Sequence, residues 1–257
     1  MIDDFIFVLK RWRIIHLLGI TKMRERYSRS KLGQLWLTLS NLVYLILVGV
    51  VWSVIWKMPV DEYLPYIGVG HVIYIFIAQT LNESSEIFTA DARYYLNEKI
   101  PFLMSIFSHI YRSFLVFIHN IPLFIILVLW SSAAYLSIGF IWMISVILLL
   151  LFLFFSAYII ASVSTRFRDL QQIFSIIFQL TFLISPVMWK LSFVPLEYRA
   201  YVMINPIASF LELVRNPIIG LEVQEYALLS SSLWVTFVFI LAVFLHKKFD
   251  KKIIFWV

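Results

Sequence analysis

The sequence contains no cysteine, and only 14% of its 257 residues are charged. The lack of cysteine excludes disulfide bonds and thiolate metal sites. The five histidines are spaced neither as HxxxH nor as HExxH, so we expect no metal site. Neither GxxxxGKS nor GxxxxGKT occurs, which excludes a phosphate-loop ATP site in this chain. We therefore expect no cofactor here, and any ATP and Mg²⁺ to be bound by a partner.

Most of the sequence consists of long stretches without a charged residue. They cover residues 32–56, 63–82, 113–165, 170–189 and 226–246. A helix that crosses about 30 Å of hydrocarbon needs roughly 20 apolar residues. The 53-residue run exceeds one crossing, and the cluster Ser131, Ser132, Ser137 and Gly139 offers a turn within it. We predict an all-α polytopic membrane protein with six transmembrane helices, near 34–56, 64–82, 104–130, 138–163, 172–188 and 228–246.

Basic residues are distributed unevenly between the two ends of these helices. With six crossings both termini share one compartment, and 16 of the 21 Lys and Arg residues lie there, in segments 1–33, 83–103, 164–171 and 247–257. Such an excess marks the cytoplasm. We attribute the basic charge to orientation and anionic lipid rather than to nucleic acid. The first uncharged run has no small-residue cleavage pattern, so we expect it to be a retained anchor and not a removed signal peptide.

One transmembrane domain, 1–257, is expected to consist of a cytoplasmic interfacial segment (1–33), a six-span bundle (34–246) and a cytoplasmic tail (247–257). An N-terminal amphipathic helix is predicted because Phe5, Leu9, Trp12 and Ile15 lie opposite Lys10, Arg11 and Arg13. It is either a lipid anchor or a docking element. After Gly19, five basic residues are suited to phosphate, namely Lys22, Arg24, Arg26, Arg29 and Lys31.

Two segments outside the spans have amphipathic or apolar patterns. Asn82 is expected to cap a helix over 83–97, with Ile87, Ala90 and Tyr94 on one face, which favours contact with a partner. Residues 190–225 contain three prolines and two apolar pieces too short to cross. We predict an external re-entrant helical hairpin there, which turns near Asn216 and Pro217. Glu212 and Arg215 form either a pair within it or a solvated salt bridge.

A few polar and aromatic residues lie inside the predicted spans. His109 and Arg112 are one turn apart, and ionisable groups at this depth suggest a polar conduit or proton relay. The alternative is that Arg112 snorkels to the headgroups or pairs with a neighbouring span. The rings of Tyr44, Phe155 and Tyr158 either line a path for sugar or face lipid. Gly68 and Gly70 are interpreted as helix packing.

Two stretches are similar to a known family. Residues 21–36 read TKMRERYSRSKLGQLW, which resembles the basic RYxxSxLGxLW signature at the start of the permease subunits of polysaccharide ABC exporters, the ABC-2 type. The second stretch resembles the same family's RD, SPV and NP motifs. It comprises Thr165 to Asp169 (TRFRD), Ser185 to Trp189 (SPVMW), Pro195, Asn205-Pro206 and Arg215.

The resemblance implies a homodimeric permease with two ATPase subunits, which exports a polyprenyl-diphosphate-linked O-antigen, capsule or teichoic-acid type polymer across the bacterial inner membrane. It also implies that Phe5 to Leu18 and Glu83 to Asn97 dock the ATPase and that spans one and five line the path. Docking contacts are then expected from Trp12, Glu86, Ile87, Asp91 and Tyr94. Path contacts are expected from Tyr44 and Phe178, and pyrophosphate contacts at the entry from Arg24, Arg26 and Arg29.

The chain departs from the family pattern at two positions. Lys22 stands where an acidic residue is usual, and Asn41 stands where span one usually has proline. Two other functions stay open at this stage. One is an ATP-independent, membrane-embedded transferase or flippase of lipid-linked glycans that uses His109 and Arg112. The other is a passive scaffold.

Overall fold

The computed structural model describes residues 2–27, 31–33, 35–98, 100–130 and 139–257, and no strand occurs among them. The helices in chain order are α1 (Ile2–Lys10), α2 (Trp12–Tyr27), α3 (Leu35–Ile55), α4 (Val60–Ser84), α5 (Ile87–Ala90), α6 (Ala92–Glu98), α7 (Phe102–Ile118), α8 (Ile121–Trp130), α9 (Phe140–Arg166), α10 (Leu170–Ile184), the 3-10 turn η1 (Leu191–Phe193), α11 (Leu196–Met203), α12 (Pro206–Arg215) and α13 (Glu225–Ile253). The all-α prediction is confirmed for these residues.

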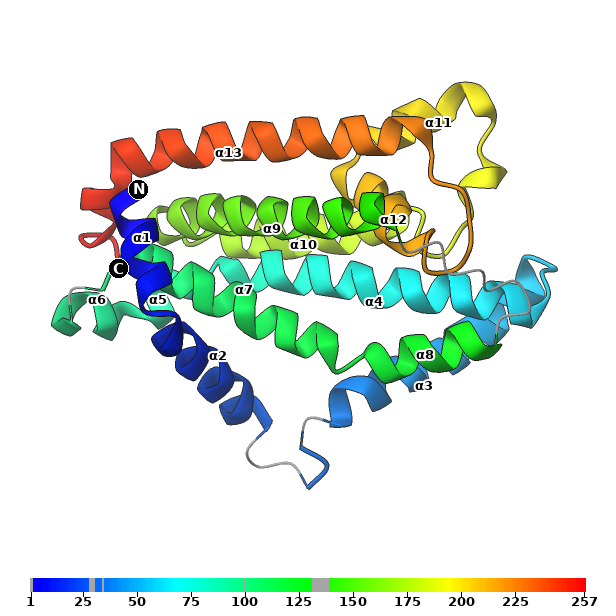
Figure 1. The fold of residues 1–257 in the computed structure, drawn as a ribbon, viewed down its shortest axis with the longest axis horizontal. Helices are drawn as coiled ribbons and strands as arrows, with labels where there is room; N and C mark the ends of the chain where they lie inside the picture. The colour runs from blue at the N-terminus through cyan, green and yellow to red at the C-terminus, as the bar shows by residue number, and fades with distance from the viewer. Residues whose placement is uncertain (1, 28–30, 34, 99, 131–138) are drawn as a thin grey trace.

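Five stretches of helix in the described part of the chain are long and apolar enough to cross a membrane. They are α3, α4, α7 together with α8, α9 and α13. Each matches a predicted span. The long helices run side by side, and both termini lie at the same end of the bundle (Figure 1). We refer to that end as the terminal end and to the other as the far end.

The predicted fifth span corresponds to α10, which has 15 residues. At 1.5 Å per residue it reaches only about 22 Å. The chain runs toward the terminal end along both α9 and α13. Helix α10, which follows α9 in the sequence, carries the chain back toward the far end (Figure 1). The prediction of a helix to residue 188 is wrong, because Pro186 disfavours helical backbone at Ser185, which is extended.

The predicted third span is broken, which we did not expect. Helix α7 ends at Ile118 and α8 begins at Ile121. Pro122 has no N–H to offer the carbonyl of Ile118, so the helical ladder is interrupted here. Polar groups of α3 meet the break: Thr38 donates to the carbonyl of His119 (2.5 Å), and the Asn41 amide donates to Asn120 Oδ1 (2.8 Å). The turn predicted at 131, 132 and 137 lies outside the described residues.

Helix α4 is the centre of the bundle. It packs against α3, α7, α8, α9, α10 and α12, and most of its residues are buried. Glycines permit the closest approach to α3: a Cβ on Gly49 would lie 2.4 Å from a Leu64 methyl, and one on Gly68 would lie 2.2 Å from a Leu45 methyl. The assignment of Gly68 to helix packing is therefore confirmed.

The N-terminal segment differs from its prediction in two ways. It forms two helices that meet at Arg11, and α2 continues past Gly19 to Tyr27. Gly19 lies inside α2, at a position where any side chain would collide with the Tyr111 ring. The face buried against the bundle carries Val8 and Ile15, whereas most of the predicted apolar stripe is exposed, with Trp12 60% exposed.

Two further predicted elements are corrected. Asn82 caps no helix, because it lies within α4, and residues 83–97 form the end of α4 followed by α5 and α6. The predicted hairpin has one more turn than expected. The turn near Asn216 and Pro217 is present at residues 216–220, but α11 and α12 also meet in a turn at Ile204 and Asn205, after which Pro206 starts α12. Residues Ile207 to Arg215 of α12 are all buried, and its apolar side chains pack with those of α4, α9 and α13.

Candidate functional site

An open groove of about 430 Å³ lies between α3, α4 and α10. Aromatic rings line it from all three helices, and amides stand between them. The rings belong to Tyr44, His71, Tyr74, Phe178 and Phe182, and the amides to Gln79, Asn82 and Gln179. Tyr44 and Phe178, which the sequence places in spans one and five, therefore meet at one surface.

The rings of the groove form a continuous set of contacts. Tyr44 stacks on His71 with centroids 3.8 Å apart, and Phe182 contacts both His71 (6.2 Å) and Tyr74 (5.0 Å) edge-on. The Tyr74 hydroxyl donates to the Phe178 carbonyl, which ties α4 to α10. Sequence reasoning missed His71, Tyr74 and Phe182. The helical spacing of Phe178 and Phe182, four residues apart, was the available signal.

Two other predicted path residues lie away from this groove. Tyr158 is fully buried on α9 and hydrogen-bonds His246 of α13 (2.9 Å), so its ring is not available to a passing polymer. Phe155 packs edge-on against Phe239 of α13 (5.0 Å) and lines an apolar hollow. A ring in the middle of a span carries no sign of which neighbour it faces, so the sequence could not separate these residues from Tyr44.

A second hollow, of about 550 Å³, opens at the terminal end between α2, α4, α5 and α7. Four predicted docking residues line it, namely Glu86, Ile87, Asp91 and Tyr94. His109 and Arg112 line the same hollow. The fifth predicted docking residue, Trp12, is exposed on α2 and does not line it. The structure thus joins two groups of residues that the sequence presents separately.

Ion pairs form the walls of this hollow. Lys22 of α2 bonds both carboxylate oxygens of Asp91 (2.7 and 2.6 Å), and Asp91 is buried. Asp91 is therefore engaged within the chain, and its role in docking remains a prediction. Lys22, the departure from the family pattern, links α2 to the junction of α5 and α6.

The intramembrane pair is engaged with α4. His109 Nε2 lies 2.8 Å from the Thr80 carbonyl, and Arg112 forms a salt bridge with Glu83. The alternative in which Arg112 pairs with a neighbouring span is the one observed. Glu83 and Arg112 also border a smaller polar cavity of about 80 Å³ that extends to Asn41 and Asn120 at the helix break.

The three candidate phosphate ligands are only partly described. Arg24 is exposed on α2. Arg26 lies in the last turn of the same helix, and Arg29 lies outside the described residues. Their role in binding pyrophosphate remains a prediction.

The SPV, NP and Arg215 motifs converge at the far end of the bundle. Arg215 donates to the carbonyl of Pro186 (2.5 Å) and to Glu212 (2.9 Å), and its guanidinium lies 3.9 Å from the centroid of the Tyr66 ring. Asn205 accepts from the amide of Ile207 at the start of α12. Its own amide donates to Ser185 Oγ (2.9 Å).

We refer to these residues as the far-end clamp, which comprises Ser185, Pro186, Asn205, Glu212 and Arg215. The two charged side chains of the clamp are buried. The side chains of Arg215 and Glu212 are 0% and 3% exposed, so the interpretation as a solvated salt bridge is wrong. The clamp holds α12 to the segment that follows α10. Nearby, burial lowers the pKa of Lys190, and the Glu62 carboxylate 3.8 Å away opposes this shift.

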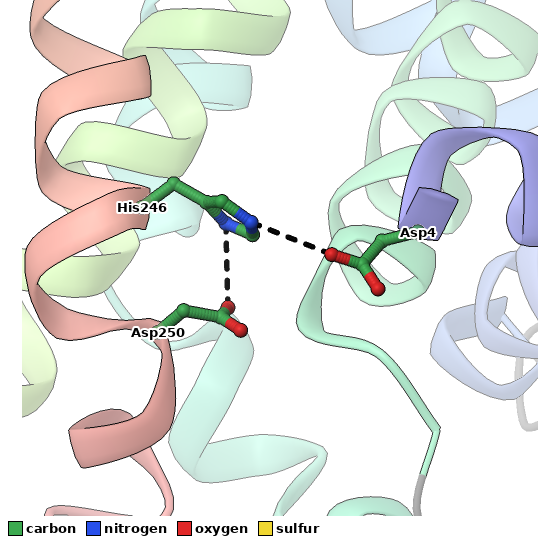
Figure 2. A group of neighbouring side chains, drawn as sticks. All are labelled: Asp4, His246 and Asp250. Carbon is green, nitrogen blue, oxygen red and sulfur yellow. Dashed lines mark ion pairs between the residues drawn. The ribbon is translucent and has the colours of Figure 1, made fainter. Parts of the chain in front are cut away.

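One cluster with metal-binding side-chain types joins the two ends of the chain. Asp4 of α1 lies 3.4 Å from His246 Nε2, and Asp250 lies 3.3 Å from His246 Nδ1. Figure 2 shows the two carboxylates against different nitrogens of the ring, rather than arranged around one shared point. The His246 imidazole is therefore held between two carboxylates, and its contact with Asp4 links α13 to α1.

Comparison with known proteins agrees with this architecture. Residues 15–219 match the ABC-2 type transporter family. The chain is 22% identical to the O-antigen export system permease protein RfbA of Klebsiella pneumoniae over 191 residues, which are 74% of this chain and 73% of that protein. It is 26% identical to the polysialic acid transport protein KpsM of Escherichia coli over 216 residues, 82% of this chain and 83% of that protein.

The family match spans the groove, the hollow at the terminal end and the far-end clamp. RfbA of Myxococcus xanthus is also similar, at 22% identity over 192 residues, which cover 74% of each chain. The chain is a multi-span member of the ABC-2 type transporter family.

Proposed function

We propose that this chain is the transmembrane subunit of an ATP-driven exporter, which moves a lipid-linked polysaccharide out of the cytoplasm across a bacterial inner membrane. Two copies would act with two ATPase subunits, which bind ATP and Mg²⁺. Similarity to an O-antigen permease and to a polysialic acid transport protein supports this substrate class. The absence of a phosphate loop from the sequence supports a separate ATPase.

The groove between α3, α4 and α10 is the observation that carries the proposal. A glycan that crosses a membrane needs hydrogen-bonding groups and flat apolar surfaces along its route. Rings and amides supply both in this groove. The exposed apolar faces of α3 and α10 flank it and include Val43, Leu47, Ile173, Ile177 and Leu180. A second copy placed against these faces would close the groove into a conduit.

The proposed topology has six crossings, with the terminal end in the cytoplasm. Helix α1, the start of α2 and the end of α13 lie at that end and carry basic residues, among them Lys10, Arg13, Lys247 and Lys248, as the positive-inside rule requires. Helix α10 and the turn that follows it make the short fifth crossing. Because α12 is only ten residues long and is buried between spanning helices, we propose that it dips into the membrane from the outer side.

Coupling to the ATPase is proposed to pass through the hollow at the terminal end. Glu86 is exposed at its rim, and Ile87 and Tyr94 line it. The ion pairs connect this surface to α2 through Lys22 and to α7 through Arg112. A displacement of α5 and α6 by the ATPase would therefore also displace α4 and α7. Because α4 forms one wall of the groove, this displacement would change the groove.

The test reverses the charge of Glu86. In the reconstituted complex we expect Glu86→Lys to reduce stimulation of the ATPase by about tenfold, because it places a cation at the docking surface. Glu197→Lys is the matched control, since Glu197 is equally exposed but lies on α11 at the far end, and it should leave stimulation unchanged. Normal stimulation in Glu86→Lys would refute this docking site.

A further inference from the structure

The groove between α3, α4 and α10 has no charged side chain among its eleven lining residues, all of which lie in the described part of the chain. Its polar groups are amides, a serine, two tyrosines and an imidazole. Arg112 and Glu83 border the smaller neighbouring cavity, where their charges neutralise each other in a salt bridge. The groove therefore offers hydrogen bonds and ring faces without offering a countercharge.

This lack of countercharge discriminates between two kinds of polysaccharide. A linear polymer of sialic acid carries a carboxylate on each residue. Each carboxylate that leaves water without a cationic partner costs several kcal/mol, about as much as any buried unpaired charge. An uncharged polymer pays only for its hydroxyls, which the amides of the groove can satisfy. One of the relatives named above, the polysialic acid transport protein KpsM, is named for a polyacid.

His71 supplies one polar atom that lacks a partner. Its side chain is 6% exposed, and no group in the described residues hydrogen-bonds its Nδ1. A buried polar atom without a partner is unfavourable, so a ligand that satisfies it gains affinity. A sugar hydroxyl both donates and accepts, so it fits either tautomer of the imidazole. The half-buried Tyr44 ring covers His71 at 3.8 Å, so a sugar reaches Nδ1 by displacing that ring.

We propose that this groove recognises an uncharged glycan and that a sugar hydroxyl bonds His71 Nδ1 when Tyr44 moves aside. The inference rests on the proposed function and narrows its substrate from polysaccharides in general to neutral ones. It makes His71 a specificity-determining residue.

The experiment measures binding of two probes to the whole complex of permease and ATPase in nanodiscs. One probe is a neutral hexose tetrasaccharide, and the other is a linear tetramer of sialic acid. We expect the neutral probe to bind at least about tenfold more tightly. His71→Phe keeps the ring and its stacking but removes both nitrogens, and it should weaken binding of the neutral probe about fivefold. His16→Phe, exposed on α2 and outside the groove, should change neither affinity.

Three results would overturn the inference: tighter or equal binding of the acidic probe, unchanged affinity in His71→Phe, or no binding of either probe. Transport of the cell's own lipid-linked polymer by the same complex is measured separately. If the complex moves an acidic polymer, the proposed function stands and the preference for neutral glycans fails. If it moves no glycan at all, the proposed function itself fails.

Discussion

Arg215 is the largest fully buried side chain in the described part of the molecule, and its charge is met from several sides. Glu212 neutralises it, the Pro186 carbonyl accepts from it, and the Tyr66 ring faces its plane. A guanidinium suits this site because it is planar and has five donors. Gly70 makes room for it, since a Cβ at Gly70 would lie 3.3 Å from Arg215 Cδ. The far-end clamp thus depends on one cation.

Removing that cation should destabilise the protein strongly. Arg215→Met leaves Glu212 buried without its partner, which costs about 3–5 kcal/mol. We expect a lower apparent melting temperature for the purified protein in detergent, and partial recovery in Arg215→Met combined with Glu212→Gln. Arg199→Met, at the surface of α11, is the matched control. Equal melting temperatures for Arg215→Met and Arg199→Met would contradict the clamp.

Lys22 and Asp91 permit a second prediction at the residue scale. Their bond joins segments 69 residues apart, and the Asp91 side chain is 4% exposed. In a double-mutant cycle of Lys22→Ala and Asp91→Ala, we expect a coupling of about 0.5–3 kcal/mol in stability. Lys57→Ala, in the turn between α3 and α4, should show no coupling to Asp91→Ala. A coupling indistinguishable from zero for Lys22 would mean that the pair does not hold α2 to this hollow.

At the scale of elements, the break between α7 and α8 is the feature that best explains how the bundle could bend. Asn41 and Thr38 of α3 bond to residues at the break, so α3 and α8 are tied together. Because α3 also forms one side of the groove, a change of angle at the break would alter the groove. Asn41, which replaces the usual proline, makes one of these two bonds.

The proline at the break provides a direct test. Pro122→Ala supplies the missing N–H to the Ile118 carbonyl, so we expect one continuous helix and slower amide hydrogen exchange over residues 119–124, by about tenfold or more. Pro65→Ala is the matched control, because Pro65 lies within the unbroken α4. If exchange over 119–124 were the same in Pro122→Ala and wild type, the break would have another cause.

The sequence predicted the spanning helices well, because long uncharged runs have few alternatives in a membrane. It failed where tertiary contacts override local signals. Asn82 suggested a helix start, yet α4 continues past it, since the neighbouring Glu83 is held by Arg112 of α7. Asn216 and Pro217 suggested a turn, and residues 216–220 form one, in which the Asn216 amide donates to Glu212 and to the carbonyl of Glu222. The additional turn before Pro206 was not predicted.

The candidate groove was predictable only in part. Tyr44 and Phe178 were expected at a path because the resemblance implied that spans one and five line it. His71 was not, since one histidine within a span carries no information about its neighbours. Asp91 was expected at the docking surface because the resemblance implied that residues 83–97 contact the ATPase, and its bond to Lys22, 69 residues away, was not expected. Pairings over such separations cannot be deduced from local patterns.

At the scale of the whole molecule, the proposed function divides transport between two proteins: this chain would form the path, and the ATPase would supply the energy. The hollow at the terminal end and the groove share α4, which connects the proposed ATPase surface to the proposed path. The exposed apolar faces of α3 and α10 leave the groove open on one side. Under the proposed function, a single copy would form half of a passage, and transport would need both a second copy and an ATPase.

Reconstitution tests this requirement most directly. Proteoliposomes would contain the permease alone, the ATPase alone or both, and delivery of a lipid-linked glycan across the bilayer would be followed with a membrane-impermeant lectin. We predict ATP-dependent delivery only when both proteins are present, and none from the permease alone with or without ATP. Delivery or chemical modification of the glycan by the permease alone would contradict the account.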